Sequence, residues 1–356
     1  MRILILQQSV EKRSDYADYV SLLITDYAHW LGYENIQINS LNHVKAIQDN
    51  CIILFEENHS WNLFFEKKLS FFISKNNINV LVDLRETLFK LTQHPRLSIL
   101  MEPDDPKKKI SKTKITPVLP THSTFITYAH EKVEKMNSLI PEKNAAIYQV
   151  PYTASHDFKE LDWPEKVLIK AQYTGNKEYF LCMGCELESE LLELLKGFSK
   201  FKKWQQSSMQ LLIILDEKEW LDHFKEKLNN YRYKEDVQMM EEVNMAQYAS
   251  LFAAAYCFIH PTNNQGSQEA LVSALQCSIP VICLDSPALH EYAEEAALYM
   301  PVWDSSEISK NMIGIYKNEN HKTQMEGSAR VQAQKYKREE VEKKLWALLE
   351  TQCGKK

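Results

Sequence analysis

The chain has 356 residues, of which 44% are hydrophobic, so it is long enough for two globular domains with full cores. Its formal net charge of -6 argues against a nucleic-acid-binding protein, because such proteins usually carry a strongly basic face. No stretch approaches the ~20 apolar residues of a transmembrane helix, and the opening residues MRILIL are too short for a signal-peptide core. Seven cysteines, an odd number spread over predicted strands and helices, indicate reduced thiols in a cytoplasmic protein.

The first half of the chain alternates predicted strands and helices. Strands are predicted at residues 2–7, 35–38, 51–55, 79–84, 124–127 and 146–150, and helices at 16–31, 41–47, 63–74 and 131–139. Such alternation is typical of a parallel sheet that is covered on both faces and binds ligands beyond the carboxyl ends of its strands. The rhythm stops at residues 102–120, which hold four prolines and are predicted to form a surface excursion.

Residues 156–177, rich in charged and aromatic side chains, are predicted to link this part to a second alternating set. Its strands are predicted at 179–183, 210–215, 237–240, 257–259 and 281–284, and its helices at 188–201, 218–228, 246–254, 268–277, 288–297 and 305–316. Residues 338–352 carry apolar side chains on one helical face. The sequence therefore predicts an α/β fold with two doubly wound domains, at 1–160 and 161–335, and a terminal helix at 336–356.

One stretch, residues 256–282, has the layout of a ligand site. A short apolar strand ends at His260-Pro261, a polar loop leads to Gly266, and Ser267 is placed to cap a helix with apolar residues at helical spacing. Pro280 ends this unit before a second buried strand. Backbone N–H groups and the positive end of a helix face a ligand in such a strand–loop–helix arrangement.

Several segments carry a resemblance to a known family. They are HPT at 260–262, QGSQ at 265–268, SIPVI at 278–282, the stretch ALHEYAEEAALYM around Glu291, IYQVPYTASHDF at 147–158, VLVDLRETL at 80–88, and the closing QKYKREEVEKKLWALLE. Together with the order of elements, they resemble the retaining glycosyltransferases of the GT-B fold, which share a "glycosyl transferases group 1" C-terminal domain. The resemblance implies two Rossmann-like domains that face a cleft, and a closing helix that crosses back to the N-terminal domain. No metal or other cofactor is implied.

The resemblance also assigns roles to residues. It implies donor stabilisation by the backbone of Gly266, Ser267 and Gln268 at the helix N-terminus, with Gln265 holding the sugar. A histidine of the N-terminal domain contacts the donor sugar in this family, and the candidates here are His59 and His94. Lys202 and Lys203 are further candidates for contact with the donor.

The chain departs from the family at the donor site. Two glutamates that hold sugar and ribose hydroxyls are replaced by Gln265 and Ser273. In the GCELESELL segment that begins at Gly184, Cys185 and Ser189 stand where the family has an arginine and a lysine for the diphosphate. A unit-charge pair at 4 Å is worth ~4 kcal/mol at an effective dielectric near 20, so these changes weaken nucleotide-sugar binding.

Two functions therefore stay open. One is hexosyl transfer from a nucleotide sugar to a glycan or lipid-linked acceptor. The other is a catalytically inactive, degenerate homologue that binds a glycan or a partner protein.

Cys182 and Cys185 have redox or zinc spacing, but no second cysteine pair accompanies them, which favours core cysteines. A basic cluster is either a solvated loop or a contact for a charged acceptor or for anionic lipid at the inner face of a membrane: Lys107, Lys108, Lys109, Lys112 and Lys114.

Overall fold

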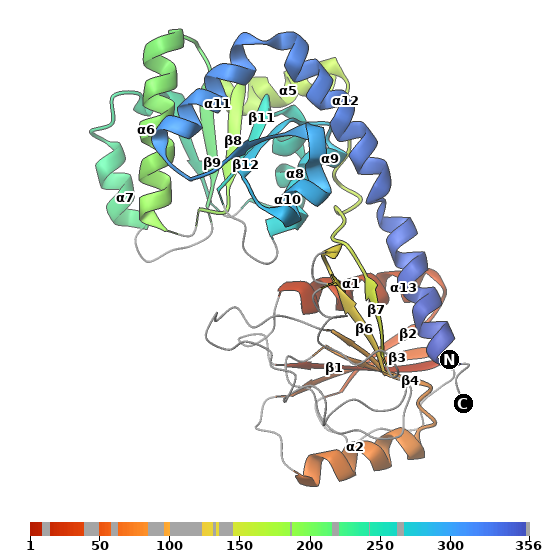
Figure 1. Cartoon of the computed structure of the whole chain (residues 1–356). Helices are drawn as coiled ribbons and strands as arrows, with labels where there is room; N and C mark the ends of the chain where they lie inside the picture. The colour runs from red at the N-terminus through yellow and green to blue at the C-terminus, as the bar shows by residue number, and fades with distance from the viewer. Residues whose placement is uncertain are drawn as a thin grey trace. The chain divides into compact units, whose positions relative to one another are not determined.

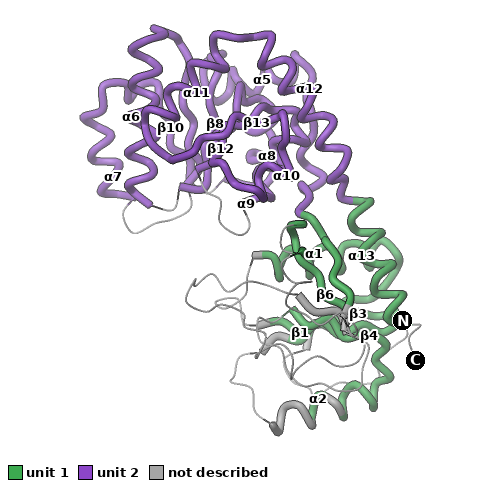
Figure 2. Tube along the Cα trace, in the orientation of Figure 1, with its two compact units in different colours: residues 1–151, 339–356 green, residues 152–338 purple. Residues whose placement is uncertain are grey.

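The structure is a computed structural model of the chain, and its elements divide into two compact units (Figures 1 and 2). The described residues are 1–8, 15–38, 50–57, 63–84, 96–99, 123–130, 133–134, 145–185, 187–215, 221–241, 243–261 and 267–353. The first unit comprises Met1–Pro151 and Glu339–Lys356, and the second comprises Tyr152–Arg338. The first unit thus ends at residue 151, against the sequence-based boundary at 160, and includes the end of the chain.

A seven-stranded parallel sheet forms the centre of the first unit. Its strand order is β2-β3-β1-β4-β5-β6-β7. The strands are β1 (Arg2–Gln8), β2 (Glu34–Ile38), β3 (Cys51–Glu57), β4 (Val80–Asp83), β5 (Arg96–Ile99), β6 (Ser123–Thr127) and β7 (Ala145–Gln149). Because β1, β3 and β4 are apolar along nearly their whole length, they occupy the buried middle of the sheet.

Helices from both ends of the chain pack in this unit. They are α1 (Asp15–Trp30), α2 (Leu63–Lys75) and the last helix, α13 (Arg338–Cys353). Trp346 of α13 lies edge-on to Tyr33 at 5.1 Å between ring centroids and 5.7 Å from Tyr27 of α1. Gln352 donates a hydrogen bond of 2.6 Å to the hydroxyl of Thr124 in β6. The predicted return of the closing helix to the N-terminal domain is therefore present.

The second unit contains a six-stranded parallel sheet in the order β10-β9-β8-β11-β12-β13. The strands are β8 (Tyr179–Met183), β9 (Gln210–Ile214), β10 (Val237–Met240), β11 (Cys257–His260), β12 (Val281–Leu284) and β13 (Ala297–Met300). The chain runs outward from β8 to one edge and then returns to start β11 on the other side of β8. The sheet is therefore doubly wound, with its switch point between β8 and β11.

Helices cover both faces of the second sheet. They are α5 (Trp163–Thr174), α6 (Glu188–Gln205), α7 (Leu221–Leu228), α8 (Met245–Ala254), α9 (Ser267–Gln276), α10 (Pro287–Ala293), α11 (Ser305–Lys317) and α12 (Glu319–Lys335), with short 3-10 turns η2 (Lys234–Asp236) and η3 (Glu294–Ala296). Helices α6 and α11 pack against each other over one apolar core, and α9 lies between α8 and α10 in a second group of packed helices (Figure 1).

Four features of the sequence prediction were wrong. Strand β13 was missed, and its first residue, Ala297, was placed in a predicted helix at 288–297. Residues 163–174 fall in the expected linker, yet they form helix α5, because Asp162 and Glu165 make a capping box and Gly175 closes the helix at φ 59°. Strand β5 was missed because RLSI is short and has a charged first residue. Helix α12 was missed because its sequence is polar, with few apolar residues at helical spacing. The predicted helix at 41–47 lies outside the described residues, as does the predicted helix at 131–139 apart from residues 133 and 134.

Candidate functional site

The switch point of the second sheet brings two sequence-predicted segments to one edge. The carboxyl ends of β8 and β11 are neighbours, with Ile259 opposite Cys182. The loop after β8 contains Gly184 and Cys185, and helix α9 starts at Ser267 after the loop that follows β11. Ligands of doubly wound sheets bind at such a point, where helix N-termini direct backbone N–H groups outward.

The loop after β8 is built by a glycine and closed by a buried thiol. Gly184 has φ 87°, a left-handed conformation that favours glycine. Cys185 is 2% exposed, and its Sγ lies 3.9 Å from that of Cys182. Ser189, in contrast, is not buried in the first turn of α6. Cys185 therefore belongs to the core at the position where the resemblance expects a cation, while Ser189 is accessible to solvent.

The cysteines of the chain are structural rather than reactive. Six of the seven are buried, and only Cys353 is partly exposed. Burial raises the pKa of Cys277 and of Cys283 to about 12, and it holds the pKa of Cys182 well above its usual value. Thiols in such surroundings stay protonated and inert, in line with the prediction of core cysteines.

Helix α9 presents buried polar side chains near the switch point. Gln268, in its first turn, is 1% exposed, and its Oε1 has no hydrogen-bond partner among the described residues. Ser273 is also buried, and its hydroxyl donates to the carbonyl of Glu269 at 2.9 Å within the helix. The hydroxyl of Ser273 is therefore already bonded to the backbone of its own helix. The side chain of Ser267 and residues Gln265 and Gly266 lie outside what the structure describes.

A row of side chains lines the carboxyl end of the sheet on the face toward α8, α9 and α10. His260 of β11 is 1% exposed and tilts against Phe258, with ring centroids 5.4 Å apart. Tyr248 of α8 directs its hydroxyl to the sulfur of Met183, the last residue of β8. His260 lies close to this edge because it is the last residue of β11. The sequence analysis treated His260 only as the residue at which a strand ends.

One cluster at the same edge was not anticipated from the sequence. His290 of α10 hydrogen-bonds through Nε2 to Oδ1 of Asp285 at 2.8 Å. Its ring also stacks on Tyr299 of β13, with centroids 3.6 Å apart and planes at 15°. Asp285 and His290 are half exposed, at 56% and 47% of their side-chain area. The five-residue spacing of Asp285 and His290 offers no sequence signal, because a loop and a helix start separate them.

Lys202 does not reach the donor site and was wrong as a candidate. Its side chain is 6% exposed, and its Nζ donates to the carbonyls of Ser207 at 2.5 Å and Met209 at 3.0 Å. It also pairs with Asp236 at 2.9 Å. The lysine closes the C-terminal end of α6, where cations are favoured by the helix dipole.

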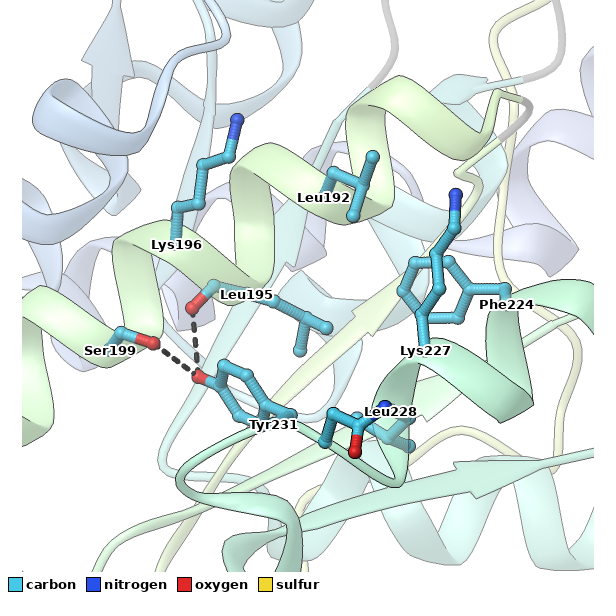
Figure 3. A pocket seen from close by; sticks show the side chains of 9 residues that line it. Leu192, Leu195, Lys196, Ser199, Phe224, Lys227, Leu228 and Tyr231 are labelled. Carbon is cyan, nitrogen blue, oxygen red and sulfur yellow. Dashed lines mark hydrogen bonds between the residues drawn. The ribbon is translucent and has the colours of Figure 1, made fainter.

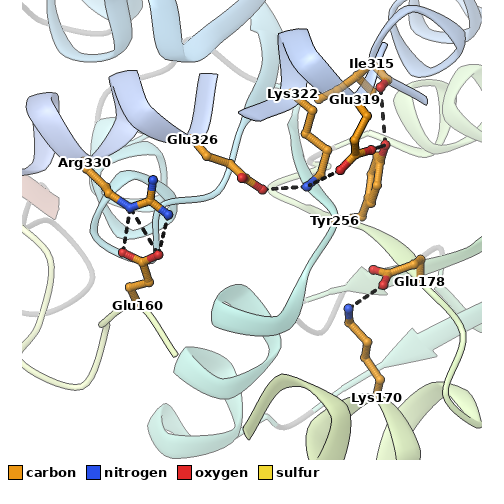
Figure 4. Close-up of polar contacts among 9 residues, drawn as sticks. All are labelled: Glu160, Lys170, Glu178, Tyr256, Ile315, Glu319, Lys322, Glu326 and Arg330. Carbon is orange, nitrogen blue, oxygen red and sulfur yellow. Dashed lines mark hydrogen bonds and ion pairs between the residues drawn. The ribbon is translucent and has the colours of Figure 1, made fainter. Parts of the chain in front are cut away.

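At the C-terminal end of α9, a triad of Ser278, Glu160 and Arg330 fixes a strained backbone conformation at the serine. Ser278 follows α9 with φ 60°, a backbone conformation that favours glycine. The family that the sequence resembles has a glycine at this position. Its hydroxyl donates to Glu160 at 2.9 Å, and Glu160 receives a forked ion pair from Arg330 of α12 (Figure 4). The Arg330 bond is the main reason that the pKa of Glu160 is lowered. This triad ties residues 160, 278 and 330 together.

A second charged group in Figure 4 also serves structure. Lys322 bonds to Glu326 at 2.6 Å and lies over the ring of Tyr256, 4.7 Å from its centroid. Tyr256 precedes β11 and Glu178 precedes β8, so this group lies at the amino edge of the sheet, away from the switch point. Glu178 there pairs with Lys170 at 2.6 Å.

Two cavities lie away from the switch point. One, of about 370 Å³, is formed by α6, α7 and the turn after α7 (Figure 3). Its floor is apolar, and Tyr231 closes it by donating to the carbonyl of Leu195 while accepting from Ser199, each at 2.8 Å. Burial raises the pKa of Tyr231 to about 12. The other, of about 260 Å³, lies between β7 and α13 in the first unit.

Several candidates from the sequence lie outside the described residues. They are His59, His94 and the basic cluster Lys107, Lys108, Lys109, Lys112 and Lys114. In the ranges that the structure describes, no three His, Cys, Asp or Glu side chains are grouped as metal ligands require. No helix among the described residues is long and apolar enough to cross a bilayer.

Comparison with known proteins gives these features a family context. Residues 170–332 match the family described as "Glycosyl transferases group 1". Over 134 residues the chain is 25% identical to the O-antigen chain mannosyltransferase RfbU of Salmonella typhimurium, a match that covers 37% of each protein. The chain thus spans little more than a third of that relative's length.

Solved structures resemble the whole chain. A glycosyltransferase from Rickettsia africae superposes with a TM-score of 0.73 at 12% identity, over 100% of this chain and 99% of that one. The Anabaena protein HepE, in complex with UDP and glucose, superposes with a TM-score of 0.69 at 10% identity, over 99% and 100% of the two chains. WaaG, a glycosyltransferase involved in lipopolysaccharide biosynthesis, gives 0.65 at 11% identity, over 97% and 98%. These likenesses confirm the predicted GT-B fold.

Proposed function

Since residues 170–332 match the glycosyl transferases group 1 family in a chain with the GT-B fold, we propose that the protein binds a nucleotide sugar and transfers its hexose to a glycan or lipid-linked acceptor. The observation that carries this proposal is the start of α9 at the switch point between β8 and β11. A helix N-terminus there stabilises the diphosphate that leaves the donor. The O-antigen mannosyltransferase and the UDP-glucose-binding HepE support the same class of reaction and ligand.

Residue roles in this proposal follow the sequence resemblance. Backbone N–H groups at Gly266, Ser267 and Gln268 face the diphosphate, and Gln265 holds the sugar. Gly184 and Cys185 shape the loop beside them, with Ser189 at its outer rim, and His59 is the candidate for contact with the sugar. Such a reaction needs little acid–base chemistry from side chains, because it depends on stabilising charge that develops in the transition state. It needs no metal ion.

A second function is favoured by a specific observation. At the two positions where the resemblance expects cations, the chain has Cys185, a buried thiol, and Ser189. Ser273 donates its hydroxyl to the carbonyl of Glu269 in its own helix. These groups supply no positive charge for a diphosphate. We therefore keep as the alternative a catalytically inactive homologue that binds a glycan or a partner protein.

The test is nucleotide binding by the intact chain. UDP, GDP, ADP and their hexose conjugates should raise the melting temperature at millimolar concentration, because a ligand bound only by the folded state stabilises it by RT ln(1 + [L]/Kd). Transfer is then measured by release of the nucleoside diphosphate in the presence of a lipid-linked glycan. If no nucleotide changes the melting temperature, the transferase proposal is wrong and the glycan-binding alternative remains.

A matched pair of variants places the site. Ser189→Lys adds a cation to the accessible first turn of α6, and it should tighten UDP or GDP binding about tenfold, or 1.4 kcal/mol. Thr323→Lys adds the same charge to an exposed position in the first half of α12 and should leave the affinity unchanged. Equal affinities of the two variants would contradict the placement of the diphosphate beside α6.

A further inference from the structure

The proposed function requires a group that recognises sugar hydroxyls, and the positions aligned with the family glutamates do not supply it. Ser273 is buried and bonded within its own helix. The carboxylates at the start of α6 are also engaged, since Glu188 pairs with Lys227 at 2.5 Å and Glu190 accepts from the backbone of Leu187 at 3.1 Å. Vicinal hydroxyls are best held by a carboxylate with an accessible oxygen.

Asp285 has that property at the same edge of the sheet. Its Oδ1 is bonded to His290, and its Oδ2 has no hydrogen-bond donor among the described residues. The imidazole is held from two directions, by Asp285 at its edge and by Tyr299 at one face. Tyr299 is itself fixed, because its hydroxyl donates to the carbonyl of Glu294 at 2.8 Å. The acceptor and the aromatic ring are therefore oriented before any ligand arrives.

Strand register places this pair close to the switch point. His260 at the end of β11 lies opposite Cys283 of β12, and Cys283 lies opposite Tyr299 of β13. Asp285 is two residues beyond Cys283, at the carboxyl end of β12. Neighbouring strands are about 4.8 Å apart and rise about 3.3 Å per residue, so the backbone of Asp285 lies roughly 5–10 Å from the end of β11. Helices α9 and α10 also pack on each other (Figure 1). A nucleotide sugar on the N-terminus of α9 is long enough to span this distance.

The charges around the pair favour hydroxyls over phosphate. Asp285, Glu291 and Glu295 are acidic, and Glu294 is paired with Lys335 at 2.8 Å. A phosphate would be repelled by these carboxylates, whereas a polyol donates hydrogen bonds to them. The exposed face of His290 also offers a flat surface for the C–H face of a sugar ring. We propose that Asp285 and His290 bind a vicinal diol, either of the nucleotide ribose or of the hexose, beside α9.

The experiment measures binding of defined probes to the full chain. UDP, 2′-deoxy-UDP, UDP-glucose, GDP-mannose and methyl α-mannoside are titrated into the parent and into Asp285→Asn and His290→Gln, with calorimetry or ligand-observed NMR. Asp285→Asn should weaken the probes that carry the recognised diol about tenfold, and His290→Gln should weaken them severalfold. Glu226→Gln removes an exposed carboxylate on α7, away from this edge, and should leave every affinity within twofold.

The probes separate the sources of the diol and the two levels of the proposal. If 2′-deoxy-UDP binds the parent as weakly as UDP binds Asp285→Asn, the diol is the ribose. If UDP binds the parent and Asp285→Asn equally, while UDP-glucose, GDP-mannose or the mannoside binds the variant more weakly, the diol is that of the hexose. Nucleotide binding that is the same in all variants overturns this inference and leaves the proposed function intact. Mannoside binding that is lost in Asp285→Asn, without any nucleotide binding, supports the inference and contradicts the transferase function. If the parent binds no probe, both are wrong.

Discussion

Glu193 illustrates how a single residue of this chain supports a helix other than its own. It lies on α6, and its Oε2 accepts the backbone N–H of Ser305, the first residue of α11, at 2.9 Å. Its Oε1 also accepts from Lys196 at 2.6 Å. The Lys196 bond, together with the Ser305 backbone bond, lowers the pKa of Glu193 to about 2. A carboxylate at a helix N-terminus is stabilising because it faces the positive end of the helix dipole.

This carboxylate makes stability depend on pH in a stated direction. Because its pKa in the folded protein is lowered, its contribution is complete above its ordinary value of 4.5 and disappears as the pH falls toward about 2. Glu193→Gln should therefore lower the free energy of unfolding by about 1 kcal/mol at pH 7, and the difference from the parent should shrink between pH 4.5 and 2. Urea unfolding at several pH values measures this. Glu226→Gln, on the exposed face of α7, is the control, and a difference that persists unchanged at pH 2 would contradict the role of Glu193.

At the scale of elements, the close contact between α6 and α11 depends on a glycine. A Cβ built on Gly197 of α6 would lie 2.7 Å from Cγ2 of Ile308 and 2.9 Å from its Cβ, so α11 approaches α6 more closely than any side chain allows. Ile308 is fully buried, and it has no room to move aside. Glycine in the middle of a helix is otherwise unfavourable. The packing of α6 on α11 explains why it is present.

Two glycine substitutions test this with opposite expected signs. Gly197→Ala should destabilise the protein by about 1–3 kcal/mol, because the added methyl overpacks the interface with Ile308. Gly314→Ala, in α11, meets nothing within 4 Å and should stabilise by up to about 1 kcal/mol through helix propensity. Thermal or chemical denaturation compares the two. Equal effects would mean that the α6–α11 contact is looser than described.

For the whole molecule, the chain divides between two units that it connects twice, near residues 151 and 338. Each unit secures its own side of these crossings. In the first, Tyr16 and Tyr19 of α1 donate to the carbonyls of Val150 and Pro151 at 2.9 and 2.8 Å. In the second, Tyr292 of α10 accepts from the backbone of Tyr152 at 3.0 Å and stacks on Tyr336 at 4.6 Å. Both crossings thus start from ordered backbone.

The return of α13 to the first unit predicts an effect confined to that unit. Trp346 is 5% exposed and packs on Tyr27 and Tyr33, so Trp346→Ala should cost about 3–5 kcal/mol of stability in the first unit. Hydrogen exchange should show lost protection in residues 1–151 and 339–356 and unchanged protection in 152–338. Trp163→Ala, at a side chain that is 76% exposed, is the control. Equal loss of protection in both units would contradict their independence.

The sequence by itself determined the two doubly wound units and the place of the switch-point loops. Buried parallel strands are continuous apolar runs, and helices between them follow a period of 3.6, so both signals are local. Within residues 256–282, the apolar run, the prolines and Gly266 were sufficient to predict the strand–loop–helix unit. Helix α5 and strand β5 were not visible in this way, because capping and short strand pairing outweigh their weak periodicity.

Tertiary structure alone decided which side chains are available at the switch point. Burial removed Cys185 and Ser273 from the solvent-facing groups there, and no spacing rule predicts burial at single positions. Lys202 lies instead at the C-terminal end of α6. The tertiary fold also brought Asp285, His290 and Tyr299 together from a loop, a helix and a strand. Such a cluster depends on the register of β12 with β13 and on the direction in which α10 leaves the sheet. These contacts are close in the sequence, but strand pairing and helix direction create them, and no spacing rule in the sequence records either.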